Sequence, residues 1–350
     1  MPFVFIRGWN SLPLADSAGL VSVLAMRFVW LALFALLPSC GTVEFYTQAV
    51  TGHTILMAKR KPVAKLIADP KTPPAFRERL LLSQRMLAFA HDELGISSRG
   101  SYELYSDLKR EHTVYVVHAA PELSLEPKRW WYPVVGEQDY RGYFSERLAE
   151  REKARLRRHG YETWAEGVDA YSTLGVFRDP LLNTFIDRDE TSFAELIFHE
   201  LAHHHYYRPG DTRFNEGMAE AVARESVRRW FKKTGRPELA ARYEVRLKRL
   251  AQARTAIGHT VEHMRKVYAS DLPNEAKRRE KAAEIARLKV RLQVLRGEWG
   301  GGLAAWIHGP INNARLNAFI AYEDEVPKFV KLLKDCHGDF PCFWEKVKGL

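Results

Sequence analysis

Residues 199–203 read His199-Glu200-Leu201-Ala202-His203, which is an H-E-x-x-H motif. Ser192-Phe193-Ala194-Glu195 has the pattern of a capping box that starts a helix, and Arg208-Pro209-Gly210 ends it. The motif is therefore expected within a helix of about four turns. Its i, i+4 spacing places both imidazoles on one face, where they can hold one Zn²⁺ ion with Glu200 beside it. Two histidines stacked in a core without a metal are the alternative interpretation.

A third ligand is needed, because a catalytic zinc site usually has three protein ligands and one open position. The metzincin pattern is excluded, since it requires glycine and histidine where this chain has Tyr206 and Pro209. Asn215-Glu216-Gly217 follows in a second predicted helix, which Asp211 or Thr212 opens. This arrangement resembles that of the gluzincin metallopeptidases and implies Glu216 as the third ligand.

Three more polar residues lie close to these in the sequence. Glu220 is one helical turn beyond Glu216 on the same face, where it is placed to accept the second N–H of a ligand histidine. A salt-bridging glutamate at the surface is the alternative. His204 and His205 point away from the face of the two motif histidines, so we expect neither to be a ligand.

The composition is that of a globular protein. Of 350 residues, 46% are hydrophobic and 27% are charged, which excludes a disordered, collagen-like or polytopic membrane protein. The formal net charge of +10 comes mostly from residues 239–297, which hold 15 Lys or Arg against 6 Asp or Glu. Interleaved aromatic residues are missing there, so no nucleic-acid partner is expected. A solvated face is the preferred interpretation, and contact with an anionic membrane is the alternative.

The first forty residues have the features of a lipoprotein export signal. Met26-Arg27 precedes an apolar run over residues 28–37, which is too short to span a bilayer but fits a signal-peptide core. Leu37-Pro38-Ser39-Cys40 resembles a bacterial lipobox, so we expect translation to start at Met26, residues 1–39 to be removed and Cys40 to carry lipid. Gly41, in place of aspartate, favours the periplasmic side of the outer membrane. A buried N-terminal helix is the alternative.

The other two cysteines, Cys336 and Cys342, are close together, with Gly338 and Pro341 to turn the chain between them. An oxidising compartment permits disulfides. We therefore expect a Cys336–Cys342 bond, with two unpaired thiols as the alternative.

Hydrophobic periodicity and turn residues divide the remaining chain. Helices are predicted over residues 73–96 and 146–158, and strands over residues 114–117, 131–135, 140–144, 171–177 and 183–187. From about residue 191 the pattern is almost entirely helical, and two long helices over residues 239–269 and 274–297 should form a hairpin.

The chain after Cys40 resembles a family of bacterial aminopeptidase lipoproteins within the gluzincin group. The matching stretches are Ala119–Ser124, Pro133–Gly136, Tyr140–Phe144, Ala170–Gly175, Phe198–His203, Gly210–Glu216, Asn312–Ala314, Tyr322 and Val326-Pro327. The resemblance implies an α+β, predominantly helical fold: one zincin-like domain over residues 40–350, with a small antiparallel sheet and the basic hairpin. This chain departs from the family at Trp131 and Glu137, which stand where the family tends to carry a cysteine pair.

The activity implied is peptide hydrolysis, most directly by an aminopeptidase, with zinc as the cofactor and Glu200 as general base for the metal-bound water. In this fold class an edge strand before the zinc helix binds the peptide backbone, and Ser172, Thr173, Leu174 and Gly175 are the candidates. Candidates for stabilising the oxyanion are Tyr322, Asn312, Asn313 and Tyr171. A zinc endopeptidase and a catalytically silent periplasmic scaffold lipoprotein remain the alternatives.

Overall fold

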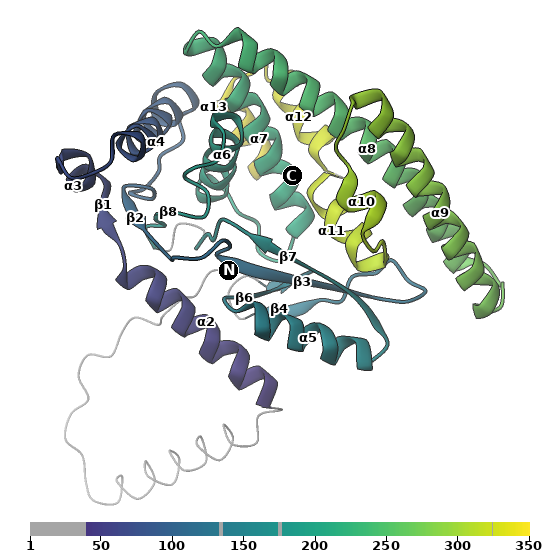
Figure 1. The fold of residues 1–350 in the computed structure, drawn as a ribbon. Coiled ribbons are helices and arrows are strands. Elements are labelled where there is room, and N and C mark those ends of the chain that lie inside the picture. Colours follow the sequence, from purple (N-terminus) through teal and green to yellow (C-terminus); the bar gives the residue numbers. More distant parts are fainter. Residues whose placement is uncertain (1–39, 133–135, 174–176, 324) are drawn as a thin grey trace, which may run out of the picture.

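The structure is a computed structural model that describes residues 40–132, 136–173, 177–323 and 325–350. It is mostly helical, with three small sheets (Figure 1). The helices are α2 (Cys40–Ala58), α3 (Val63–Ala68), α4 (Pro74–Leu94), α5 (Glu146–Arg158), α6 (Glu190–His205), α7 (Thr212–Lys233), α8 (Pro237–Ala269), α9 (Asn274–Trp299), α10 (Ala304–His308), α11 (Asn313–Glu323), α12 (Val326–Asp335) and α13 (Phe340–Lys348). The strands are β1 (Lys61–Pro62), β2 (Leu104–Ser106), β3 (Val114–Pro121), β4 (Trp130–Tyr132), β5 (Gly136–Gln138), β6 (Arg141–Tyr143), β7 (Tyr161–Val168) and β8 (Leu181–Leu182). Within the described ranges, none of the helices is both long and apolar enough to cross a membrane.

The main sheet is antiparallel, with strand order β6-β3-β7. β3 alternates its side chains between two faces, as a pleated strand must. Val117 and Ala119 lie in an apolar cluster with Phe45 of α2 and Leu156 of α5. On the other face Val116 stands directly opposite Gly142 of β6 and Glu166 of β7, and this face looks toward the helices that carry the candidate site.

The predicted motif helix and its successor exist as α6 and α7, but α6 begins earlier than predicted. Its N-cap is Asp189, whose side chain accepts from the Ser192 backbone N–H, so the capping-box assignment of Ser192 is wrong. Asp211 caps α7 in the same way, because its side chain accepts a hydrogen bond from Phe214 N–H. Asp211 was one of the two residues predicted to open this helix. Each cap satisfies a backbone donor that a helix start leaves free.

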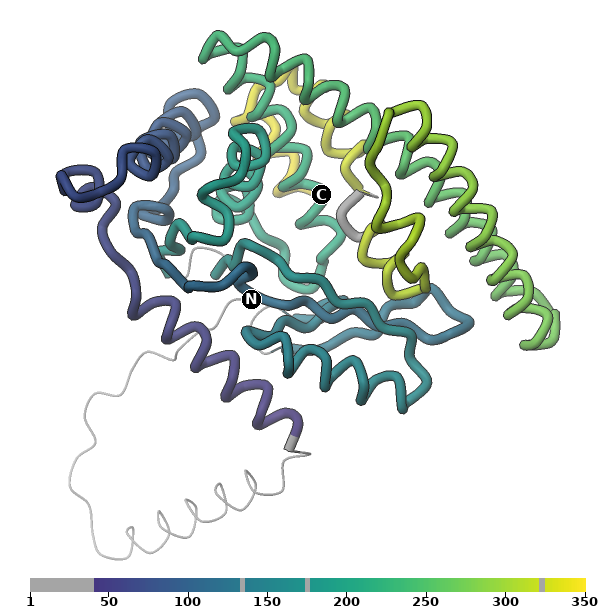
Figure 2. Tube along the Cα trace, viewed as in Figure 1, coloured from purple at the N-terminus to yellow at the C-terminus, as the bar shows by residue number. Residues whose placement is uncertain are grey.

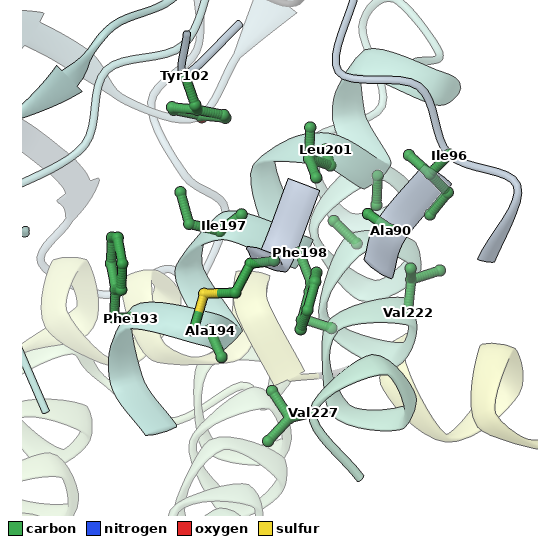
Figure 3. Close-up of a cluster of buried hydrophobic side chains, with 14 of the residues drawn as sticks. Ala90, Ile96, Tyr102, Phe193, Ala194, Ile197, Phe198, Leu201, Val222 and Val227 are labelled. Atoms are coloured by element: carbon green, nitrogen blue, oxygen red, sulfur yellow. The ribbon is translucent and has the colours of Figure 1, made fainter. Parts of the chain in front are cut away.

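The inner face of α6 belongs to the largest apolar cluster of the protein. Ile197, Phe198 and Leu201 are fully buried there, and Val222 and Val227 of α7 lie beside them (Figure 3). Full burial of one such side chain contributes roughly 1.5–3 kcal/mol. This packing fixes the rotation of α6 about its axis and turns the motif histidines toward the sheet.

The helical hairpin is confirmed as α8 and α9, which run along one edge of the molecule (Figure 2). A buried lysine joins it to the sheet: Lys281 Nζ lies 2.6 Å from Glu162 Oε1 of β7 and donates to the Glu122 carbonyl at 2.7 Å. The hairpin of residues 239–297 is therefore anchored to the main sheet.

The predicted Cys336–Cys342 disulfide is present and joins α12 to α13, with 5.8 Å between the Cα atoms. α13 then lies behind the motif helix, because the Trp344 ring stacks on His205 with 4.3 Å between centroids.

One strand prediction is wrong, and another is wrong over the residues that the structure describes. Residues 183–187 form turns after the short β8, and residues 171–173 and 177 form no strand, whereas residues 174–176 lie outside the described residues. The long strand before α6 is instead β7, whose sequence mixes charged and apolar residues without strict alternation. Residues 131–135 are only partly described; their first two residues belong to β4, and Trp131 there faces Glu137 of β5 directly across the hairpin, where the family resemblance implied a cysteine pair.

Candidate functional site

Three predicted ligand residues come together between α6 and α7. The Nε2 atoms of His199 and His203 are 3.1 Å apart. Glu216 of α7 places Oε2 at 3.2 Å from His199 Nε2 and Oε1 at 3.8 Å from His203 Nε2. The three donor atoms lie within 4.8 Å of one another, so this group could hold a metal ion.

The residues that flank Glu216 explain how α7 returns so closely along α6. Asn215 is buried and holds the connecting loop with two hydrogen bonds, accepting from Arg208 N–H at 2.7 Å and donating to the Arg208 carbonyl at 2.6 Å. At Gly217 a Cβ atom would lie 2.6 Å from the Cβ of Glu325, so only glycine permits this approach of the segment before α12. The Asn-Glu-Gly pattern thus shapes the loop and the packing on both sides of the carboxylate.

Charge interactions inside the group are strong because its side chains are mostly withdrawn from solvent: His203 is buried, and His199 and Glu216 are only slightly exposed. Burial alone would raise the pKa of Glu216, but its hydrogen bonds to His199 and His203 lower that pKa far below the usual range. Burial would likewise lower the pKa of His199, but the hydrogen bonds to Glu216 and Glu220 raise it well above the usual value. These opposite shifts favour a charged His199 imidazole beside an ionised Glu216 carboxylate.

Glu220 lies where the sequence placed it, behind His199. Its Oε2 atom is 3.6 Å from His199 Nδ1, the nitrogen that faces away from the ligand group. Its Oε1 atom accepts from Arg224 Nε at 2.8 Å. Burial raises the pKa of Glu220, but His199 and Arg224 together lower it to about 2, so Glu220 is a carboxylate that can orient the His199 ring.

The two other histidines of α6 point elsewhere, as predicted. His204 is buried against Asp179, with 3.1 Å between Nε2 and Oδ2, and His205 stacks on Trp344.

Glu200 lies beside the ligand group, and its Oε2 atom is buried with no hydrogen-bond partner among the described residues. A carboxylate oxygen without a hydrogen-bond partner is available to accept a proton from a water molecule or from a substrate.

A cavity of about 190 Å³ opens at the group. Its polar lining consists of the three ligand residues, Glu200, Gln138, Thr212 and Asn215, together with Tyr140 and Tyr207. Its apolar lining consists of Val114, Val116, Phe144, Val168, Ala170 and Tyr171. The sheet face, the segment after β7 and the two helices therefore enclose one space.

Two tyrosines of this cavity were missed by sequence reasoning. The Tyr207 hydroxyl accepts from Gln138 Nε2 at 3.4 Å, and the Tyr207 ring lies 6.3 Å from that of His203. Burial raises the pKa of Tyr207 to about 12, with Gln138 opposing and Glu216 reinforcing the shift. Burial also raises the pKa of Tyr140. Both are thus neutral hydroxyl donors; the position of Tyr207, four residues after His203, was the available signal.

The predicted substrate-binding residues are divided. Tyr171 and Ser172 line the cavity, whereas Leu174 and Gly175 lie outside the described residues. Thr173 is buried and donates to Asp179 instead of facing the cavity, which corrects its predicted role.

Asn312 and Asn313 are not at the cavity, which corrects their predicted contact with substrate. Asn312 Nδ2 donates to the Thr163 carbonyl at 3.1 Å. Asn313 Nδ2 donates to carbonyls at the end of β3 and in the loop after it, and its Oδ1 accepts from Tyr268. Both therefore fasten α11 to the sheet. Tyr322 is in α11, but its side chain is outside the described part, so its catalytic role stays a prediction.

The fold and the site together define a class: a mostly helical α+β protein in which an H-E-x-x-H helix and a glutamate of the next helix form a group that could hold a metal ion. The model of a family described as "Putative aminopeptidase" matches residues 44–350, and the chain belongs to this family. This confirms the resemblance found in the sequence. Neither a curated protein nor a solved structure matches the chain.

Proposed function

We propose that the protein is a zinc-dependent peptidase, and an aminopeptidase in particular. The observation that carries the proposal is the convergence of two imidazole Nε2 atoms and the carboxylate of Glu216. Zn–N bonds of about 2.0–2.1 Å at tetrahedral angles separate two ligand nitrogens by about 3.3 Å, close to the 3.1 Å between His199 and His203. Two nitrogens and one oxygen are also a ligand set typical of catalytic zinc.

Zinc, when bound, supplies a Lewis acid that lowers the pKa of water to about 7. The residues of the chain supply the rest of the proposed reaction. Glu200 takes the proton of the attacking water and returns it to the leaving amine. Glu220 keeps the His199 ring oriented. Tyr207 and Tyr140 are proposed to donate hydrogen bonds to the developing oxyanion, in place of the asparagines expected from the sequence.

The alternatives are an endopeptidase and a silent scaffold lipoprotein. The family description favours release of N-terminal residues over internal cleavage. The unpartnered oxygen of Glu200 beside the ligand group favours catalysis over a purely structural site.

The cellular place is also a proposal, and it rests on the sequence of the first forty residues. After removal of residues 1–39, Cys40 would carry lipid and hold the protein on the periplasmic side of the outer membrane. The Cys336–Cys342 bond supports an oxidising compartment, because the cytosol keeps most thiols reduced.

The test measures zinc content and hydrolysis by the purified protein, with peptides that carry a free or an acetylated N-terminus. We expect about one zinc per chain and cleavage of the free peptide only. Glu200→Gln should retain zinc and lose at least a hundredfold in kcat. The matched control is Glu225→Gln, since Glu225 of α7 pairs with Arg229 away from the cavity. Cleavage of both peptides alike would favour the endopeptidase, and zinc-loaded protein that cleaves neither would favour the scaffold.

A further inference from the structure

The outward side of α2 carries only one charged side chain, that of Glu44, over its whole length. Exposed residues on this side are Thr42, Val43, Thr47, Val50, Thr51, Thr54 and Ile55, and Val43 and Val50 are 65% and 43% exposed. Glu44 is the only Asp, Glu, Lys or Arg in Cys40–Ala58. The inward side packs Phe45, Ala49 and Leu56 into the body.

A surface helix of a globular protein normally has one apolar face and one charged face. α2 departs from this pattern, because valine and threonine occupy the positions where lysine and glutamate are usual. An exposed face of this kind is a mark of contact with another phase or molecule.

The neighbouring surface helix, α5, is strongly basic. It holds six Lys or Arg and three Glu, and Arg147, Arg151, Arg157 and Arg158 are exposed. An ion pair between Arg151 and Glu44, 2.8 Å long, joins α5 to α2, and Figure 1 shows both helices at the same edge of the molecule. Positive charge and a helix face whose single charged residue, Glu44, is paired with Arg151 thus adjoin on one surface.

We infer that this surface, formed by α2 and α5, lies on an anionic phospholipid bilayer. The inference rests on the proposed lipid anchor, because Cys40 is the first residue of α2. Acyl chains at that position would bring α2 to the lipid surface before any other element. Each basic residue near an anionic surface adds about 1 kcal/mol, roughly a fivefold increase in binding, and one lipid signal combined with basic residues anchors a protein more firmly than either alone.

The basic hairpin is the competing surface, and its position argues against it. α8 and α9 run along a different edge of the molecule from α2 (Figure 2). Many of their charges are engaged within the protein: Lys281 pairs with Glu162, and both Arg287 and Arg291 pair with Glu284.

The test compares two exposed valines on helices, Val50 of α2 and Val290 of α9, which is 59% exposed. Each is replaced by cysteine in the full lipidated chain, labelled with nitrobenzoxadiazole and placed on phosphatidylethanolamine vesicles containing one quarter phosphatidylglycerol. Brominated acyl chains should quench the label of Val50→Cys at least twofold and leave that of Val290→Cys unchanged. Neutralising Arg147, Arg151, Arg157 and Arg158 to Gln should at least halve the quenching at residue 50.

Several outcomes would overturn the inference. Quenching at residue 290 in place of residue 50 would assign docking to the hairpin. Quenching at neither residue would show that the protein is attached through its lipid alone and that neither surface contacts the bilayer. Insensitivity to the four Arg→Gln changes would remove the role of anionic lipid. Mass spectrometry of Cys40 separates these failures from a failure of the anchor, because an unmodified Cys40 would overturn the anchor and the docking together.

Discussion

Asp179 should be one of the most sensitive positions of the protein outside the candidate metal group of His199, His203 and Glu216. Its carboxylate is 1% exposed and accepts four hydrogen bonds. Thr173 donates from N–H at 2.9 Å and from Oγ1 at 2.7 Å, Ser172 donates from Oγ at 3.3 Å, and His204 Nε2 lies at 3.1 Å. Because Ser172 lines the cavity and His204 follows His203, this carboxylate fixes one cavity wall against α6, the helix that carries the two candidate ligand histidines.

Asp179→Ala leaves those buried donors unsatisfied. Breaking a buried charged network by removal of one partner costs about 3–5 kcal/mol, and the unpaired Thr173 and His204 groups place the expected loss in that range. Asp179→Asn keeps the shape and one acceptor oxygen, so about 1–2 kcal/mol should be lost. The exposed Asp335, which pairs with Lys331 at 2.6 Å, is the control, and Asp335→Ala should cost less than about 0.5 kcal/mol.

The assay is urea unfolding of metal-free protein, followed by tryptophan fluorescence, so that metal binding does not contribute to the measured free energy. The zinc-loaded variants are then compared in peptide hydrolysis. We expect Asp179→Asn to raise KM at least threefold while zinc content and kcat stay within twofold, because the wall moves and the metal group does not. A loss below 1 kcal/mol for Asp179→Ala, or an unchanged KM for Asp179→Asn, would refute the reasoning.

Three other outcomes follow from the contacts. Glu216→Ala should abolish zinc binding, whereas Glu220→Ala should weaken it by roughly 10–100-fold, as measured by competition with a chelator; the reverse ranking would exchange their roles. Lys281→Met should lower the free energy of unfolding in urea by about 2 kcal/mol, because it strips a buried ion pair from the hairpin. Burial lowers the pKa of His118 to about 4, below that of the unfolded chain, so unfolding free energy should fall by up to about 3 kcal/mol from pH 6.5 to 4. His118→Asn should flatten that dependence, and an equal slope in both proteins would contradict it.

The parts of the site that the sequence predicted are those with local spacing. His199 and His203 share a helix face because they are four residues apart, and Glu220 follows Glu216 by one turn. The prediction of Glu216 as the third ligand required only that α7 return along α6, and Pro209 and Gly210 indicated such a turn. The hairpin was equally local, since two long helical stretches meet at a turn that contains Pro273.

The cavity walls could not be predicted in this way, because they are assembled from residues far apart in the chain. Val116 reaches the site through its register with Glu166 and Gly142, and no single-sequence period encodes which strands pair. Tyr140 was assigned to a strand but not to the site for the same reason.

Asn312 and Asn313 show the converse error, in which a polar pair inside a family stretch is taken as functional. Buried amides are costly unless every donor and acceptor is satisfied, so they also mark places where a fold must be fastened. Asn313 donates to three carbonyls of one loop and also accepts from Tyr268, and it is fully buried. Both N–H groups of the Asn313 amide are thus engaged within the protein, and its complete burial keeps the side chain away from a substrate. Among polar residues, those with an unpartnered atom beside a cavity, as Glu200 has, are therefore the stronger candidates for chemistry.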